Sequence, residues 1–173
     1  VMSVMNGFRT ELVDRILGIN GHLIVYNNKD LEISNFNEVV KKILDTENVI
    51  AVTPHLEGQA LAKTKSTVSG VIVRGTNWSD LPAKKLLWQS LDQTSINNFK
   101  DNKSIILGYR LAQRLNVNIG DHISLISPNG METVLGILPV KKNFIIGGFF
   151  DIGMYEYDNN FIFIPWEKAE EFL

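Results

Sequence analysis

The spacing of apolar residues changes repeatedly along the 173 residues of this chain, and this limits the fold more than any other feature. Residues 1–17 and 36–44 carry apolar side chains every three or four positions, which predicts amphipathic helices. Short apolar runs of strand length lie between and after them. The predicted strands are 22–26, 49–52, 71–73, 105–107, 122–126, 144–150 and 160–164. Helices and strands in this order predict an α+β fold rather than a doubly wound parallel sheet.

Three further helices and two interruptions complete the prediction. Helices are expected at 84–88, at 108–115 and from Pro165 onward, where proline suits a first helical turn. Ser127–Gly130 is expected to break a strand, and Asp151–Asn159 to form a polar and aromatic loop. The chain therefore divides into many short elements joined by turns.

Composition excludes several classes of function. The net charge is −2 and no basic stripe is present, so no nucleic-acid partner is expected. Without cysteine, the chain has no thiol nucleophile, disulfide or cysteine-based zinc site. No apolar run reaches the roughly 18 residues that span a bilayer, and no cleavable signal peptide is evident. The apolar start at Val1–Met5 and the end at Phe172–Leu173 nevertheless look like cut points in a longer chain.

Catalytic and metal-binding motifs are absent from the sequence. The histidines, His22, His55 and His122, are isolated and lack the spacing of a metal site. Asp151, Glu156 and Asp158 form an acidic cluster that is better explained as a solvated turn than as a calcium loop. Neither a nucleophile elbow nor a glycine-rich phosphate loop is present. We therefore expect no cofactor and no enzymatic activity.

Three stretches, in order along the chain, resemble the LolC and LolE family of transmembrane subunits of the lipoprotein-releasing ABC transporter. The first is Ser3–Phe8, continued by Glu11, Leu12 and Ile16–Gly18. The second is Ile106–Gly108, continued by Leu111, Ala112, Leu115–Val117, Gly120 and Asp121. The third is Ile145–Phe150, continued by Glu156–Asp158 and Phe161–Pro165. The resemblance extends to the wider MacB and FtsX group of periplasmic domains, from which the second and third stretches alone do not distinguish it.

The resemblance implies a MacB-like periplasmic core with five parts. Residues 1–19 would be the end of the first membrane helix and a stalk, and 20–66 the first half of a porter-like α/β subdomain. Residues 67–165 would form a strand-rich Sabre-like subdomain with a Hook-like loop at 128–144, and 166–173 the start of a return helix. The second porter half appears to be missing. The first half is therefore expected to expose apolar surface that its partner would cover.

The same resemblance implies a function in lipoprotein release. The subunit would lie in the inner membrane of a Gram-negative bacterium, with this region in the periplasm. A separate cytoplasmic ATPase and a second transmembrane subunit, the same or related, would complete the transporter. The acylated lipoprotein would pass to LolA, a soluble periplasmic carrier. The alternative is an FtsX-like or MacB-like domain that transmits ATPase motion to another periplasmic partner.

Residues 133–144 resemble the loop by which LolC-type subunits recruit LolA. The segment is apolar without a clean period, and Gly136 and Pro139 oppose regular structure. The predicted LolA-binding residues are Gly136, Ile137, Leu138, Pro139, Val140, Lys141, Lys142 and Phe144. The apolar members would supply buried area and the lysines would meet acidic or carbonyl groups. The alternative is a β-hairpin whose Ile137 and Leu138 face the core.

Met5 and Phe8 are the second predicted site. At the membrane boundary that the resemblance implies, Met5 would face the cavity holding the acyl chains of the lipoprotein, and methionine is flexible and apolar enough for this. The alternative is ordinary packing of one helix against another.

Overall fold

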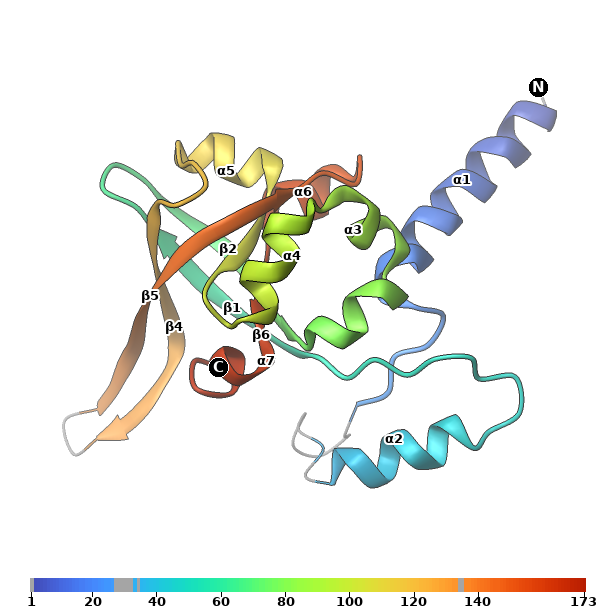
Figure 1. Ribbon diagram of the computed structural model, residues 1–173, viewed down its shortest axis with the longest axis horizontal. Helices are drawn as coiled ribbons and strands as arrows, with labels where there is room; N and C mark the ends of the chain where they lie inside the picture. Colours follow the sequence, from blue (N-terminus) through green and yellow to red (C-terminus); the bar gives the residue numbers. More distant parts are fainter. Residues whose placement is uncertain (1, 27–32, 34, 134–135) are drawn as a thin grey trace.

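Strands form the centre of the molecule and short helices surround them (Figure 1). The computed structural model describes residues 2–26, 33, 35–133 and 136–173. Within these residues the strands close into a barrel in the order β1-β2-β6-β3-β5-β4. The strands are β1 (Leu56–Lys63), β2 (Val68–Thr76), β3 (Ile105–Gly108), β4 (His122–Thr133), β5 (Gly136–Phe150) and β6 (Phe161–Pro165).

The helices lie outside the barrel or cover its ends. They are α1 (Met2–Asn20), α2 (Phe36–Leu44), the 3-10 helix η1 (Trp78–Ala83), α3 (Lys85–Ser90), α4 (Gln93–Lys100), α5 (Tyr109–Leu115), α6 (Tyr155–Asn160) and α7 (Trp166–Glu170). The mixture of helices and strands confirms the predicted α+β class at this level.

The barrel combines parallel and antiparallel strand pairs. β1–β2 and β4–β5 are antiparallel hairpins, whereas β2–β6 and β3–β5 are parallel. Leu61–Lys63 of β1 pairs with Ser124–Ile126 of β4 and closes the barrel. Closure gives every strand a neighbour on both sides over part of its length, which protects edges that would otherwise be free to pair with other chains.

Two apolar cores lie on opposite faces of this sheet. The first fills the barrel interior with side chains such as Leu107 and Ile162, and α5 and α7 contribute to it. The second lies between the barrel wall and α3, α4, η1 and the last turn of α1, and it includes Ile106, Phe150 and Phe163. Because β3 and β6 are buried on both faces, they are continuous apolar runs in the sequence.

The described residues of 21–55 lie outside the barrel (Figure 1), and Phe36 contacts Trp166 of α7 with ring centroids 5.5 Å apart. Helix α2 forms where the apolar spacing predicts it, but none of its residues is buried. The strands predicted at 22–26 and 49–52 are wrong, because both segments lack regular structure. Leu23 is 87% exposed and Ile50 is 93% exposed. A strand needs a hydrogen-bonded neighbour, and the described residues offer none to these two segments.

Several other boundaries also differ from prediction. The division placed at residue 66 separates β1 from β2, which pair along their whole length in one barrel. Helix α4 lies in a stretch without strong apolar spacing, and the expected loop 151–159 contains α6. The strand β4 continues through Ser127–Gly130, with a register shift in place of a break. The last helix starts directly after Pro165, as predicted.

Candidate partner-binding hairpin and stalk helix

The hairpin of β4 and β5 has an inner part within the barrel and an outer part that projects from it (Figure 1). β1 pairs with β4 only up to Ile126. Beyond Ser127 the described residues of β4 pair with β5 alone. Between Ser127 and Met131 the register shifts, because four steps along β4 match the two steps from Val140 to Leu138. This irregularity lies where the hairpin leaves the barrel, and such bulges redirect a strand.

The predicted LolA-binding residues are distributed between these two parts. Gly136, Ile137 and Leu138 belong to the outer strand, opposite Thr133, Glu132 and Met131. The described backbone is therefore a β-hairpin, which was the alternative to the predicted Hook-like loop. Val134 and Leu135 lie outside the described residues, as do the side chains of 129–138, so the predicted inward direction of Ile137 and Leu138 stays a prediction.

Side chains alternate between the two faces of β5 from Pro139 onward. Pro139 and Lys141 are exposed, whereas Val140 packs partly against the barrel core. Lys142 points to the side of α7, and its Nζ lies 2.7 Å from Oε2 of Glu171. This ion pair lowers the pKa of the Glu171 carboxyl. Lys142 therefore already has an acidic partner within the chain, and Lys141 is the lysine that faces solvent.

The side chain of Phe144 points into the barrel core and is not available on the surface of the hairpin. Its side chain is 7% exposed and packs edge-on against Phe172, with ring centroids 5.9 Å apart. A partner cannot reach this ring without opening the barrel. Direct contact between Phe144 and LolA is therefore a prediction that the structure contradicts, because the pleat of β5 turns this position inward.

Helix α1 extends away from the body in the direction opposite to the hairpin (Figure 1). Met5 and Phe8 are each 69% exposed, so helix packing within the described part of the chain does not account for them. Leu12, Val13 and Ile16 continue the exposed apolar surface toward the body. None of the helices in the described ranges is long and apolar enough to cross a membrane.

The last turn of α1 is fastened to the body by contacts from several elements. Ile19 is buried in the second core, and Gly18 lies so close to Leu86 that an added Cβ would sit 2.9 Å from its Cδ1. Asn20 donates a hydrogen bond to the hydroxyl of Tyr157 and accepts one of 3.1 Å from Nη1 of Arg74. The end of α1 is therefore held by both apolar and polar contacts.

Two buried cations lie at this end of α1, and the sequence reasoning missed both. Arg74 and Lys84 are each 5% exposed. Arg74 donates to Glu57 from Nε at 2.7 Å and lies over the ring of Phe161. Lys84 donates from Nζ to the carbonyl of Ile19 at 3.4 Å, and burial, followed by repulsion from Arg74, lowers its pKa to about 8. The carbonyl-rich end of a helix favours cations, which fits their place here.

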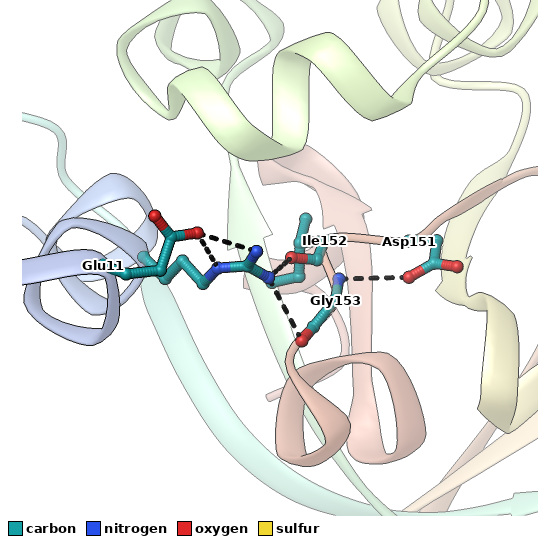
Figure 2. Close-up of polar contacts among 5 residues, drawn as sticks. Glu11, Asp151, Ile152 and Gly153 are labelled. Atoms are coloured by element: carbon teal, nitrogen blue, oxygen red, sulfur yellow. Dashed lines mark hydrogen bonds and ion pairs between the residues drawn. The ribbon is translucent and has the colours of Figure 1, made fainter. Parts of the chain in front are cut away.

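Arg15 makes the contact between α1 and the turn that follows β5 (Figure 2). Its Nε and Nη2 both lie 2.8 Å from Oε1 of Glu11, one helical turn earlier. Its Nη1 donates to the carbonyls of Ile152 and Gly153, each at 3.4 Å. Glu11 thus holds one edge of the guanidinium so that the other edge faces the turn.

Two aspartates shape the turn that receives Arg15. Oδ1 of Asp151 accepts the backbone N–H of Gly153 at 3.1 Å, and Oδ1 of Asp158 accepts that of Ile152 at 3.0 Å. Asp158 is completely buried, and its Oδ2 has no hydrogen-bond partner among the described residues. Burial, with a further contribution from nearby Asp151, raises the pKa of Asp158. The prediction of a solvated acidic turn is therefore wrong for Asp158, which has a structural role.

No metal centre is formed by the part of the chain that the structure describes, since no group of three or more potential ligand side chains converges there. His22 and His122 are exposed and His55 is half-buried, and they belong to separate parts of the fold. Burial, followed by the charge of Arg74, lowers the pKa of His55.

Comparison with known families identifies this architecture. Residues 1–173 match the model of the family described as MacB-like periplasmic core domain. This chain is a member of that family. The match covers its whole length, so the barrel, the projecting hairpin and α1 all fall within the MacB-like domain.

Curated relatives of this MacB-like domain confirm the predicted resemblance to LolC and LolE. The transmembrane protein LolC of the lipoprotein-releasing system of Neisseria meningitidis serogroup B is 29% identical over 167 residues, which is 92% of this chain and 39% of that protein. LolC of Haemophilus influenzae is 31% identical over 84% of this chain and 36% of the relative. LolE of the same organism is 24% identical over 99% of this chain and 42% of that protein. The chain thus spans about two fifths of these relatives' length.

A solved structure shares the fold of the MacB-like domain. The extracellular domain of the noncanonic ABC-type transporter YknZ from Gram-positive bacteria superposes with a TM-score of 0.52. The alignment covers 78% of this chain and 64% of that one, at 13% sequence identity. At this identity the likeness concerns the fold.

Proposed function

We propose that this chain is the periplasmic part of a transmembrane subunit of a lipoprotein-releasing ABC transporter, and that the outer β4–β5 hairpin docks the soluble carrier LolA. The projection of this hairpin, which beyond Ser127 pairs only with itself among the described residues, carries the proposal. A protruding two-stranded element presents side chains to a partner without disturbing the core beneath it. The relatives named LolC and LolE supply the transport context.

The proposal assigns no chemistry to this chain. A separate cytoplasmic ATPase drives the cycle, a second transmembrane subunit completes the transporter, and an acylated lipoprotein is the cargo. Both transmembrane subunits lie in the inner membrane, and this domain lies in the periplasm. The exposed apolar surface of α1, including Met5 and Phe8, faces the acyl chains of the lipoprotein near the membrane. Methionine and phenylalanine present large apolar surfaces suited to lipid.

The division into subdomains is also part of this proposal, with one boundary moved. The barrel from Leu56 to Pro165 corresponds to the strand-rich Sabre-like part. Residues 20–55 form the first half of a porter-like part, whose apolar surface needs further strands and helices to cover it. The exposure of Leu23, Ile24 and Ile50 supports this assignment.

Calorimetric titration of the domain with LolA of the same organism tests the docking proposal. Leu138→Asp combined with Lys141→Glu changes the outer hairpin and its solvent-facing lysine, and we expect it to abolish binding. Lys142 is left intact because its substitution would break the ion pair with Glu171. The matched control is Lys65→Glu, the same charge change between β1 and β2 at another exposed position.

The outcomes separate the candidate functions. Binding that the hairpin variant abolishes and the control keeps supports docking of LolA. Equal binding by wild type and hairpin variant removes the hairpin from the interface. Absence of binding by the folded wild-type domain rejects LolA as its partner and favours an FtsX-like or MacB-like domain with another periplasmic partner.

A further inference from the structure

Helix α1 is attached to the body at one end only. Met5 and Phe8 are largely exposed, whereas Ile19 is 2% exposed. The described contacts of α1 with the rest of the fold come from Arg15 and the residues after it. Because a helix of this length is held only in its last two turns, the angle between α1 and the body depends on those few contacts.

Arg15 is the outermost of these contacts and therefore resists tilting of α1 most effectively. Ile19 and Asn20 lie close to the pivot, whereas Arg15 lies about one turn farther along the helix axis, roughly 6–7 Å away at 1.5 Å per residue. Its guanidinium reaches carbonyls of two successive residues in one turn, Ile152 and Gly153. Contact with two acceptors fixes the orientation of the guanidinium as well as its distance from the turn.

The turn at Asp151–Gly153 is built in advance to accept this guanidinium. Asp151 and Asp158 each accept one backbone N–H of the turn. Figure 2 shows the bond from Asp151 and the two carbonyls of the turn, which face the guanidinium on α1. Gly153 has a positive φ of 70°, which glycine adopts without strain. A Cβ at this position would also lie 2.6 Å from Nη1 of Arg15. The conformation of the turn thus favours glycine at 153, and a Cβ there would displace the end of the Arg15 side chain.

Strand β5 connects this turn directly to the proposed docking hairpin. It is one strand from Gly136 in the outer hairpin to Phe150, next to the turn, with a register shift against β3 between Ile146 and Gly148. Its barrel part is held by β3 and β4, and Phe150 packs edge-on against Phe163 in the second core. Because a paired strand is stiff along its length, the position of the turn and the direction of the hairpin are tied together.

We propose that Arg15 and the turn Asp151–Gly153 form an intramolecular socket that sets the angle between α1 and the β4–β5 hairpin. Arg15 is a positioning residue, and Glu11 orients its guanidinium. The inference rests on the proposed function only where it treats the hairpin as a docking element. The geometry of the socket is independent of which partner binds.

Spin-label distances across the molecule test the socket. The chain has no cysteine, so Asn6→Cys and Lys141→Cys introduce the only two labels, one on the exposed part of α1 and one on the solvent face of β5. Double electron–electron resonance should give one narrow distance distribution for this labelled protein. Arg15→Ala in the same background should broaden the distribution and shift its maximum, because the outer contact of α1 is lost.

Two further variants make the result specific. Arg9→Ala removes another arginine of α1, at an exposed position, and should leave the distribution narrow. Glu11→Gln should broaden the distance distribution less than Arg15→Ala. In that variant the guanidinium of Arg15 keeps its hydrogen bonds to the carbonyls of the turn but loses its ion pair with residue 11. An unchanged distribution in a folded Arg15→Ala variant would overturn the socket, as would equal broadening by Arg9→Ala.

The measurement needs no partner, so the two proposals fail separately. If LolA does not bind but Arg15→Ala broadens the distribution, the socket stands and the docking role falls. If LolA binds the hairpin but the distribution stays unchanged, docking stands and the socket falls. In the isolated domain Arg15→Ala should leave the affinity for LolA at its wild-type value, because the hairpin itself is unaltered.

Discussion

The barrel and residues 20–55 carry similar apolar patterns, yet the two regions differ completely in burial. In the barrel, Ile106, Leu107 and Ile162 are 0% exposed. In residues 20–55, Leu23 and Ile50 are almost fully exposed and α2 has no buried residue. The difference teaches that an apolar pattern indicates a need for burial, whereas burial itself depends on a neighbouring element being present.

Substitution of one large side chain in each region should show the greatest contrast. Phe150→Ala removes a ring that is 1% exposed, and we expect a loss of about 3–5 kcal/mol in the free energy of unfolding. Ile50→Ala, at a position 93% exposed, should change it by less than about 0.5 kcal/mol. Denaturant titration followed by circular dichroism measures both. Comparable losses would show that residues 20–55 are packed in solution.

Glycine substitutions compare a crowded and an open position within the barrel. A Cβ at Gly108 would lie 2.2 Å from the backbone oxygen of Asp158, so Gly108→Ala should cost about 1–3 kcal/mol of stability or more. Gly70 has no atom within 4 Å of an added Cβ, and Gly70→Ala should be close to neutral. Thermal unfolding of the two variants checks the expectation. A stable Gly108→Ala protein would mean that α6 can shift away from β3.

The pH dependence of stability should distinguish a buried lysine from an exposed one. The pKa of Lys84 is about 8 in the folded protein and 10.5 ordinarily, so the unfolded chain binds more protons between these values. The contribution of Lys84 to stability therefore rises with pH from about 8 to 10.5. Lys84→Met should remove this rise when unfolding is measured across that range.

The matched control for this experiment lies in the exposed region. Lys41 of α2 is exposed, and Lys41→Met should leave the pH dependence of unfolding as in the wild type. If stability still rises with pH by the same amount in Lys84→Met, the rise comes from another titrating group.

The smallest effect is expected at the ion pair between the hairpin and α7. Glu171 is exposed, and exposed ion pairs contribute little because water and salt screen them. Lys142→Ala should therefore lower stability only slightly, and the difference should vanish in high salt. The pair lowers the pKa of Glu171, so its contribution is present at neutral pH and is lost on acidification through that pKa. Denaturant titration at low and high salt, with Lys141→Ala as the control, measures it.

Much of the fold could be predicted because its elements carry strong local signals. The helix at 36–44 and the strands at 105–107, 122–126, 144–150 and 160–164 follow from apolar spacing, and Pro165 marks the start of the last helix. The strands at 22–26 and 49–52 failed because spacing says nothing of available partners. Helix α4 was missed because its cap, Asp92 accepting the N–H of Ser95, is a weak signal among polar residues.

The candidate site was only partly accessible to sequence reasoning. The segment around Gly136 and Pro139 stood out by its composition, but the alternation that buries Phe144 and exposes Lys141 depends on the register of β5. Arg74, Lys84 and Asp158 could not be recognised as buried, since nothing near them in the sequence distinguishes them from surface charges. The partners of Arg74 and Lys84 lie far away along the chain, as do Arg15 and Ile152.

Because the outer hairpin pairs only with itself among the described residues, the distance by which it projects from the barrel can change independently of the barrel. Since the described residues of β4 beyond Ser127 pair with β5 and no third strand, cross-strand pairs can be inserted or deleted there without changing the barrel register. Each added pair would move the tip outward by about 3.4 Å. A change in the length of this hairpin can therefore match one scaffold to partners of different size while the barrel stays the same.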